Sequence, residues 1–142
     1  MKVLFLDIDG VVNCSTTNFK TDLWPLDRYM AFLVGKIIMY TECKIVLSSS
    51  WRNHPDGISV IEKHIGKVLD ITPKSWYDKE RDYHSIRGDE INKWLEKHPE
   101  VEKYAILDDD SDFYPDQKLF KTSWTTGITE EIMQEVINYL NS

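Results

Sequence analysis

Two pairs of acidic residues follow short apolar runs in this sequence. Asp7 and Asp9 come after KVLFL, and Asp108 and Asp109 come after KYAIL. Side chains alternate between the two faces of a strand, so Asp7 and Asp9 would point the same way if the strand continued through them. Carboxylates this close together raise one another's pKa unless a cation compensates their charge, and Mg²⁺ prefers oxygen ligands of this kind. The pattern predicts a magnesium site.

Hydroxyl and basic side chains that suit a phosphate group occur at two other places. Ser48 and Ser49 follow the apolar run KIVL, and Arg87 opens an expected helix over residues 88–97. A phosphate at that helix start would meet both the guanidinium group and free backbone N–H groups. Turn formation by the serines, and a surface ion pair of Arg87 with Asp89 or Glu90, are the alternative explanations.

Regular elements alternate along the chain in a way that positions these residues. Short β-branched runs predict strands, and apolar residues at helical spacing predict helices. The expected strands cover residues 2–6, 44–47, 67–71, 103–107 and 119–122, and the expected helices cover residues 26–42, 58–65, 88–97 and 129–140. Strands that alternate with helices predict an α/β fold with a mostly parallel sheet. Ligands bind at the carboxyl edge of such sheets, where the acidic and hydroxyl clusters would meet.

Helix boundaries and one helix face follow from local composition. We expect Pro25 in the first turn of the helix over residues 26–42 and Asp56 as the cap of the helix over residues 58–65. Pro99 ends the helix over residues 88–97. The helix over residues 26–42 is expected to bury a broad apolar face formed by Tyr29, Phe32, Leu33, Ile37, Met39 and Tyr40.

Composition limits the class of protein and its partners. The chain has 142 residues, of which 42% are hydrophobic and 29% charged, and we expect one domain over residues 1–142. No signal peptide or membrane span is expected, and Cys14 and Cys43 form no disulfide framework or metal motif, which is typical of a cytoplasmic protein. The net charge of −7 makes an extended duplex a poor partner, but it allows a small phosphorylated ligand or a nucleic-acid end. The oligomeric state stays open.

Four motifs, taken in order, resemble those of the haloacid dehalogenase-like (HAD) superfamily. They are DIDGV at residues 7–11, an apolar strand ending in serine at residues 45–48, Arg87 within RGDEI, and ILDD at residues 106–109. The resemblance implies a three-layer Rossmann-like fold with a mostly parallel central sheet. The segments between the motifs are too short to hold a large cap domain.

The resemblance also implies an enzyme, a phosphatase that works through an aspartyl-phosphate. Asp7 would be the nucleophile, and Asp9 would protonate the leaving oxygen and then activate water. An acid at position 9 favours phosphoryl chemistry over the dehalogenation that some members perform. Mg²⁺ would be held by Asp7, the main-chain carbonyl of Asp9, Asp108 and Asp109, and phosphoryl oxygens would be held by Ser48, Ser49 and Arg87.

Two assignments have alternatives. The fourth motif reads DDDSD, so Asp112 competes with Asp109 as the metal ligand beside Asp108. The family more often has lysine in its third motif, so Arg87 competes for the basic role with Lys74, Lys79 and Arg81.

The segments SSSWR, RGDEI and LDDDSDF are similar to the sequences of capless HAD members linked to RNA repair. They also distantly resemble the phosphatase half of bacteriophage polynucleotide kinases. This resemblance implies removal of phosphate from a nucleic-acid 3′ end or a nucleotide. Aromatic and basic side chains suited to stacking and phosphate contact are Trp51, Arg52, Trp76, Tyr77 and Arg81. A phosphatase for a small metabolite, and a non-catalytic binding module with this fold, are the alternative functions.

Overall fold

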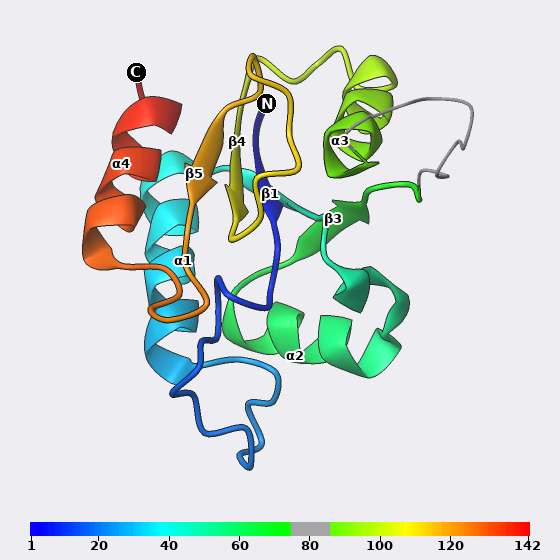
Figure 1. The fold of residues 1–142 in the computed structure, drawn as a ribbon. Coiled ribbons are helices and arrows are strands. Elements are labelled where there is room, and N and C mark those ends of the chain that lie inside the picture. The colour runs from blue at the N-terminus through cyan, green and yellow to red at the C-terminus, as the bar shows by residue number, and fades with distance from the viewer. Residues whose placement is uncertain (75–85) are drawn as a thin grey trace.

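Five parallel strands form one twisted sheet in the computed structural model (Figure 1). The structure describes residues 1–74 and 86–142. The strands lie in the order β3-β2-β1-β4-β5, and their bounds are Lys2–Leu6 for β1, Lys44–Leu47 for β2, Val68–Ile71 for β3, Lys103–Asp108 for β4 and Leu119–Lys121 for β5. The predicted α/β fold with a parallel sheet is confirmed, and within the described residues every strand pairing is parallel.

Helices cover both faces of this sheet and make it the middle of three layers. The helices are α1 (Arg28–Thr41), α2 (Pro55–His64), α3 (Ile86–Glu96) and α4 (Glu130–Leu140). Because side chains alternate along β1, Leu4 and Leu6 pack with apolar residues of α1, α2 and α4, whereas Val3 and Phe5 pack on the other face with Ile91 of α3. Two apolar cores therefore lie between the sheet and its helices, and Figure 1 shows helices on either side of the sheet.

Helix α1 starts later than expected. Asp27 is its N-cap, since its carboxylate accepts hydrogen bonds from the backbone N–H groups of Tyr29 (3.0 Å) and Met30 (3.3 Å). The expectation that Pro25 lies in the first turn is wrong, because Pro25 precedes the cap.

The expected apolar face of α1 is only partly buried. Leu33 and Ile37 are fully buried, but Phe32 and Tyr40 are 55% and 59% exposed. Tyr29 and Met39 are exposed as well. The buried face instead runs through Met30, Ala31, Leu33, Val34, Ile37 and Thr41. Apolar residues surround more of this helix than the sheet and α4 can cover, so part of them stays in solvent.

The other boundaries differ by a few residues. Helix α2 begins at Pro55 with His54 as its N-cap, so Asp56 lies in the first turn and is not the cap that the sequence predicted. A short 3₁₀ helix, η1 (Ser50–Asn53), follows β2 and was not predicted. Helix α4 begins after Thr129, whose hydroxyl caps it. Among the described residues, no helix has the length and apolarity needed to cross a lipid bilayer.

Candidate active site

The register of the sheet brings three predicted site residues to one edge. Leu6 of β1 is paired with Leu47 of β2 and with Leu107 of β4, so Asp7, Ser48 and Asp108 are the next residues on three neighbouring strands. Hydrogen bonds continue the sheet there, because the Asp7 N–H donates to the Leu107 carbonyl and the Ser48 N–H donates to the Leu6 carbonyl, both at 3.0 Å. Parallel pairing alone therefore gathers these side chains at the carboxyl edge.

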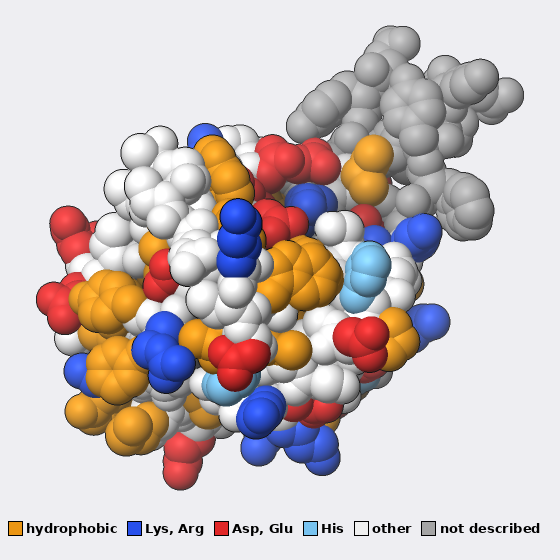
Figure 2. All heavy atoms as spheres, turned by 90° about the horizontal axis from the view of Figure 1, so that it is seen from below, with side chains coloured by type: hydrophobic (Ala, Val, Ile, Leu, Met, Phe, Trp, Pro, Cys, Tyr) orange, Lys and Arg blue, Asp and Glu red, His pale blue; other side chains and the backbone are white. Residues whose placement is uncertain are grey.

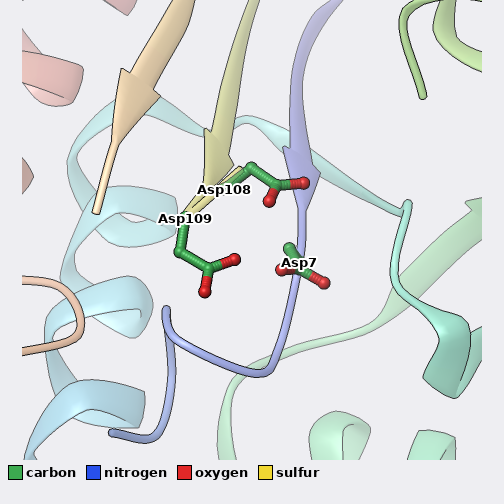
Figure 3. Close-up of side chains that lie close together, drawn as sticks. All are labelled: Asp7, Asp108 and Asp109. Carbon is green, nitrogen blue, oxygen red and sulfur yellow. The ribbon is translucent and has the colours of Figure 1, made fainter. Parts of the chain in front are cut away.

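Three carboxylates converge at this edge, as Figure 3 shows. One oxygen from each of Asp7, Asp108 and Asp109 lies within 4.8 Å of the others. Asp7 and Asp108 are buried, and Asp109 is partly exposed. Such a set of hard oxygen donors fits a divalent cation such as Mg²⁺.

Burial and mutual repulsion disfavour the ionised forms of this cluster. Burial raises the pKa of Asp108 to about 8, the negative charge of Asp7 adds to this increase, and the positive charge of Arg87 opposes it. Burial also raises the pKa of Asp7, although Arg87 and the backbone N–H of Ile8 act in the opposite direction. A cation bound between these carboxylates would lower both pKa values and release protons.

Arg87 lies against the same acids. Its Nη1 atom is 2.9 Å from Oδ2 of Asp108 and 3.5 Å from Oδ1 of Asp7, and it donates a hydrogen bond of 3.4 Å to the Ser48 carbonyl. Burial by itself would lower the pKa of Arg87, but Asp108 and Asp7 outweigh it and raise that pKa. Arg87 is therefore a fixed positive charge beside the carboxylates. It is not the surface ion pair that the alternative explanation required.

Asp112, from the loop after β4, lies beside the first turn of α3. Its carboxylate accepts a hydrogen bond of 3.2 Å from the backbone N–H of Arg87, and its carbonyl accepts one of 3.1 Å from Gly88 N–H. Asp112 thus holds the helix end that carries Arg87, whereas Asp109 belongs to the carboxylate cluster. This arrangement favours Asp109 over Asp112 as the partner of Asp108.

Gly10 lets Asp109 approach. Its φ is +80°, and a Cβ atom at this position would overlap the carboxylate of Asp109. Both the left-handed backbone and the missing side chain are needed here.

The carboxylate of Asp9 is exposed and stands apart from the three-carboxylate cluster, held by two donors. Asn13 Nδ2 donates to its Oδ1 at 2.9 Å, and the indole Nε1 of Trp51 donates to its Oδ2 at 3.0 Å. Asn13 is completely buried, donates to the Pro25 carbonyl and accepts from the Gly10 N–H, both at 2.9 Å. Sequence reasoning missed Asn13, although a polar side chain directly after the apolar pair of DIDGVV was a usable signal.

The two serines after β2 differ in their contacts. The hydroxyl of Ser49 accepts a hydrogen bond of 3.1 Å from the Trp51 N–H and so caps η1. The hydroxyl of Ser48 is buried and has no hydrogen-bond partner within residues 1–74 and 86–142. A buried hydroxyl without a partner carries a desolvation cost of about 1–3 kcal/mol, which a bound phosphoryl oxygen would remove.

Arg52 is engaged inside the protein. Its Nη2 atom lies 2.7 Å from Oε2 of Glu90, and the two side chains are only 10% and 6% exposed. Its Nη1 atom also donates to the Ser48 carbonyl at 3.1 Å. The sequence suggests Glu90 as a partner of Arg87 at the surface. In the structure Glu90 forms an ion pair with Arg52 instead, and this pair connects η1 with α3.

The remaining candidates lie elsewhere or outside the described residues. Lys74 lines a cavity of about 320 Å³ together with Asp70 and Trp94. The predicted contacts Trp76, Tyr77, Lys79 and Arg81 lie outside the described residues. Among the described basic residues, Arg87 is the one that meets the paired acids.

Comparison with known families identifies this arrangement. Residues 3–133 match the family described as "HAD domain in Swiss Army Knife RNA repair proteins", and the match contains all four motifs and the three-carboxylate cluster. No curated protein matches the sequence. The order of motifs and the Rossmann-like sheet agree with this family. Membership of this family suggests a phosphohydrolase of the HAD type. The chain belongs to the HAD domains of Swiss Army Knife RNA repair proteins.

Proposed function

We propose that this protein is a Mg²⁺-dependent phosphatase that removes phosphate from nucleic-acid ends, with 3′-phosphate ends as the principal substrate. The observation that carries this proposal is the convergence of Asp7, Asp108 and Asp109 beside Arg87 at the carboxyl edge of the sheet. Acids and a guanidinium group together suit a site that holds both a cation and a phosphate.

Asp7 is the nucleophile of the proposed reaction. A carboxylate oxygen of Asp7 attacks phosphorus, an Asp7–phosphate bond forms, and the bond between phosphorus and the leaving oxygen breaks. Asp9 gives its proton to that leaving oxygen. Asp9 then takes a proton from water, whose oxygen attacks phosphorus, so that phosphate leaves and the Asp7 carboxylate is restored.

A cation and Arg87 would compensate charge in this site, and serine hydroxyl groups would add hydrogen bonds. Bound Mg²⁺, held by Asp7, Asp108, Asp109 and the main-chain carbonyl of Asp9, would neutralise negative charge on the carboxylates and on the phosphoryl group. Arg87, which lies beside these acids, would bind the phosphoryl oxygens. The hydroxyl of Ser48, which has no partner among the described residues, supplies a further donor, with Ser49 beside it.

The openness of the site and the family support a polymer end as substrate. Among the described residues, no additional domain lies over the carboxyl edge, because loops, α1, η1 and α2 account for the segments after β1 and β2. The family description places related HAD domains in RNA repair proteins. A terminal phosphate on a strand can enter an open site that a closed lid would block.

The test is phosphate release from a matched panel of substrates. Oligonucleotides with a 3′-phosphate or a 5′-phosphate, nucleotides and sugar phosphates are compared with Mg²⁺ and with EDTA, and Asp7→Asn is the control. We expect Mg²⁺-dependent release with the highest kcat/KM on 3′-phosphate ends, and no release by Asp7→Asn. Faster turnover of a sugar phosphate would identify a metabolite phosphatase. No release from any substrate would favour the non-catalytic binding module.

A further inference from the structure

Two tryptophans form a wall beside Asp9. The Trp51 indole donates to the Asp9 carboxylate at 3.0 Å, and the ring of Trp24 meets that of Trp51 edge to face, with 4.6 Å between centroids and 77° between planes. Trp24 is 44% exposed, so much of its ring faces solvent. Figure 2, which looks onto the carboxyl edge of the sheet, shows hydrophobic side chains directly beside acidic and basic ones.

The ring of Trp51 is held firmly from behind. His54 lies against it with 4.9 Å between the ring centroids, and Gly57 lies so close that a Cβ atom there would come within 2.7 Å of Trp51 Cε3. The Trp51 backbone N–H is bound by Ser49. A ring fixed by its backbone, its neighbours and its own N–H group has lost its conformational freedom before a ligand arrives, which favours binding.

The position of Trp24 and Trp51 relative to Asp9 determines which part of a substrate these side chains can contact. The proposed general acid must come within hydrogen-bond distance of the leaving oxygen, so the group that carries this oxygen leaves beside Asp9. In a 3′-phosphorylated end, the leaving oxygen belongs to a ribose that also carries a base. The base therefore lies within one sugar of Asp9, on the side where Trp51 and Trp24 stand.

We infer that Trp24 and Trp51 form a stacking site for the base of the nucleotide whose 3′-phosphate is removed. This inference rests on the proposed function and adds to it the part of the substrate that is recognised. A flat π face accepts all four bases, so the site distinguishes a nucleotide from a sugar phosphate without reading the sequence. Neither tryptophan belongs to the four motifs.

The test compares two oligonucleotides that differ only in the terminal base. One ends in a 3′-phosphorylated adenosine, and the other ends in a stable abasic analogue with the same 3′-phosphate. We expect wild-type kcat/KM to favour the adenosine end by about 5- to 150-fold, the range that one stacked base supplies. Trp24→Ala should bring this ratio close to 1, and Trp24→Phe should restore most of it because an aromatic face returns.

Tyr40→Ala is the matched control. Tyr40 is an exposed aromatic residue one residue before the end of α1, and the chain enters the opposite edge of the sheet shortly after it. This variant should keep the wild-type ratio. A wild-type ratio near 1, or a ratio that Trp24→Ala leaves unchanged while phosphate is released, would overturn the inference.

A binding measurement separates this inference from the proposed function. If neither oligonucleotide is hydrolysed, the proposed function fails, and the stacking site is then judged by affinity. Fluorescence anisotropy with Asp7→Asn, alone and combined with Trp24→Ala, measures binding of both labelled oligonucleotides. Tighter binding of the adenosine end that disappears with Trp24→Ala supports the stacking site, and equal binding of the two ends overturns it.

Discussion

The guanidinium group of Arg87 lies 2.9 Å from the carboxylate of Asp108, although 21 residues separate them in the chain. Asp108 is completely buried, and it still has a raised pKa with Arg87 at this distance. One arginine therefore does not compensate the negative charge of the cluster. Mg²⁺ bound among the same acids would complete the compensation and leave Arg87 to bind phosphate.

The stability of the metal-free protein should fall as pH rises toward 8. The pKa of Asp108 is raised from 3.8 to about 8 in the folded state, mainly by burial, so folding keeps a proton that the unfolded chain loses. Its stabilising contribution is complete below about pH 4 and is lost as pH rises through about 8. Thermal unfolding in EDTA measures this loss, and Asp108→Asn should weaken the pH dependence.

Added Mg²⁺ should raise the melting temperature more at about pH 8 than at about pH 6, because fewer protons have to be displaced from the carboxylates at the higher pH. An equal Mg²⁺ effect at both pH values would argue against a metal site that includes Asp7 and Asp108.

Asp9→Asn should affect substrates according to their leaving groups. For a nucleotide we expect a loss of about 10²- to 10⁴-fold in kcat, because the leaving oxygen receives no proton. An aryl phosphate with an acidic leaving group needs no such proton in the first step. It should therefore release about one equivalent of phenolate per site in a rapid burst, followed by slow turnover, because water is not activated. Stopped-flow absorbance measures the burst, and a burst rate that falls as far as nucleotide turnover would remove Asp9 from the acid role.

Gly10→Ala should weaken both folding and metal binding. The left-handed backbone costs about 1–2 kcal/mol with a Cβ atom present, and that atom would displace the Asp109 carboxylate. Gly35 in α1 is the matched control, since nothing lies within 4 Å of a Cβ atom there and Gly35→Ala should stabilise the helix by up to about 1 kcal/mol. Urea unfolding and Mg²⁺ titration test both variants. Wild-type Mg²⁺ affinity in Gly10→Ala would show that Asp109 is not needed for the metal.

Arg52→Ala should act mainly on stability. Removing one partner of a buried ion pair costs about 3–5 kcal/mol, and Arg52 and Glu90 are both almost fully buried. Replacing both residues by leucine should restore part of that loss, because no charge is then left behind. Arg87→Ala should instead raise KM. Urea unfolding and steady-state kinetics separate the two effects, and wild-type stability with a raised KM in Arg52→Ala would return Arg52 to substrate binding.

Local patterns in the sequence were sufficient for most of the architecture. The alternation of apolar strands and amphipathic helices predicted the parallel sheet. This was possible because a strand or helix with a buried face has apolar residues at regular, short intervals in the sequence. The same reasoning placed Asp7, Ser48 and Asp108 together, since parallel strands end at a common edge. The buried face of α1 was predicted less well, because periodicity does not state which apolar residues a neighbouring element will cover.

Contacts between side chains from distant segments were decided by the tertiary structure. Trp51 and Asp9 are 42 residues apart, and Arg52 and Glu90 belong to different layers, so no local pattern links them. The sequence by itself determined the strand ends at which the acids stand. Packing of η1 and α3 on the sheet determined that Arg52 is buried with Glu90 while Trp51 reaches Asp9. Side chains adopt such partners only when close packing of the whole domain excludes their alternatives.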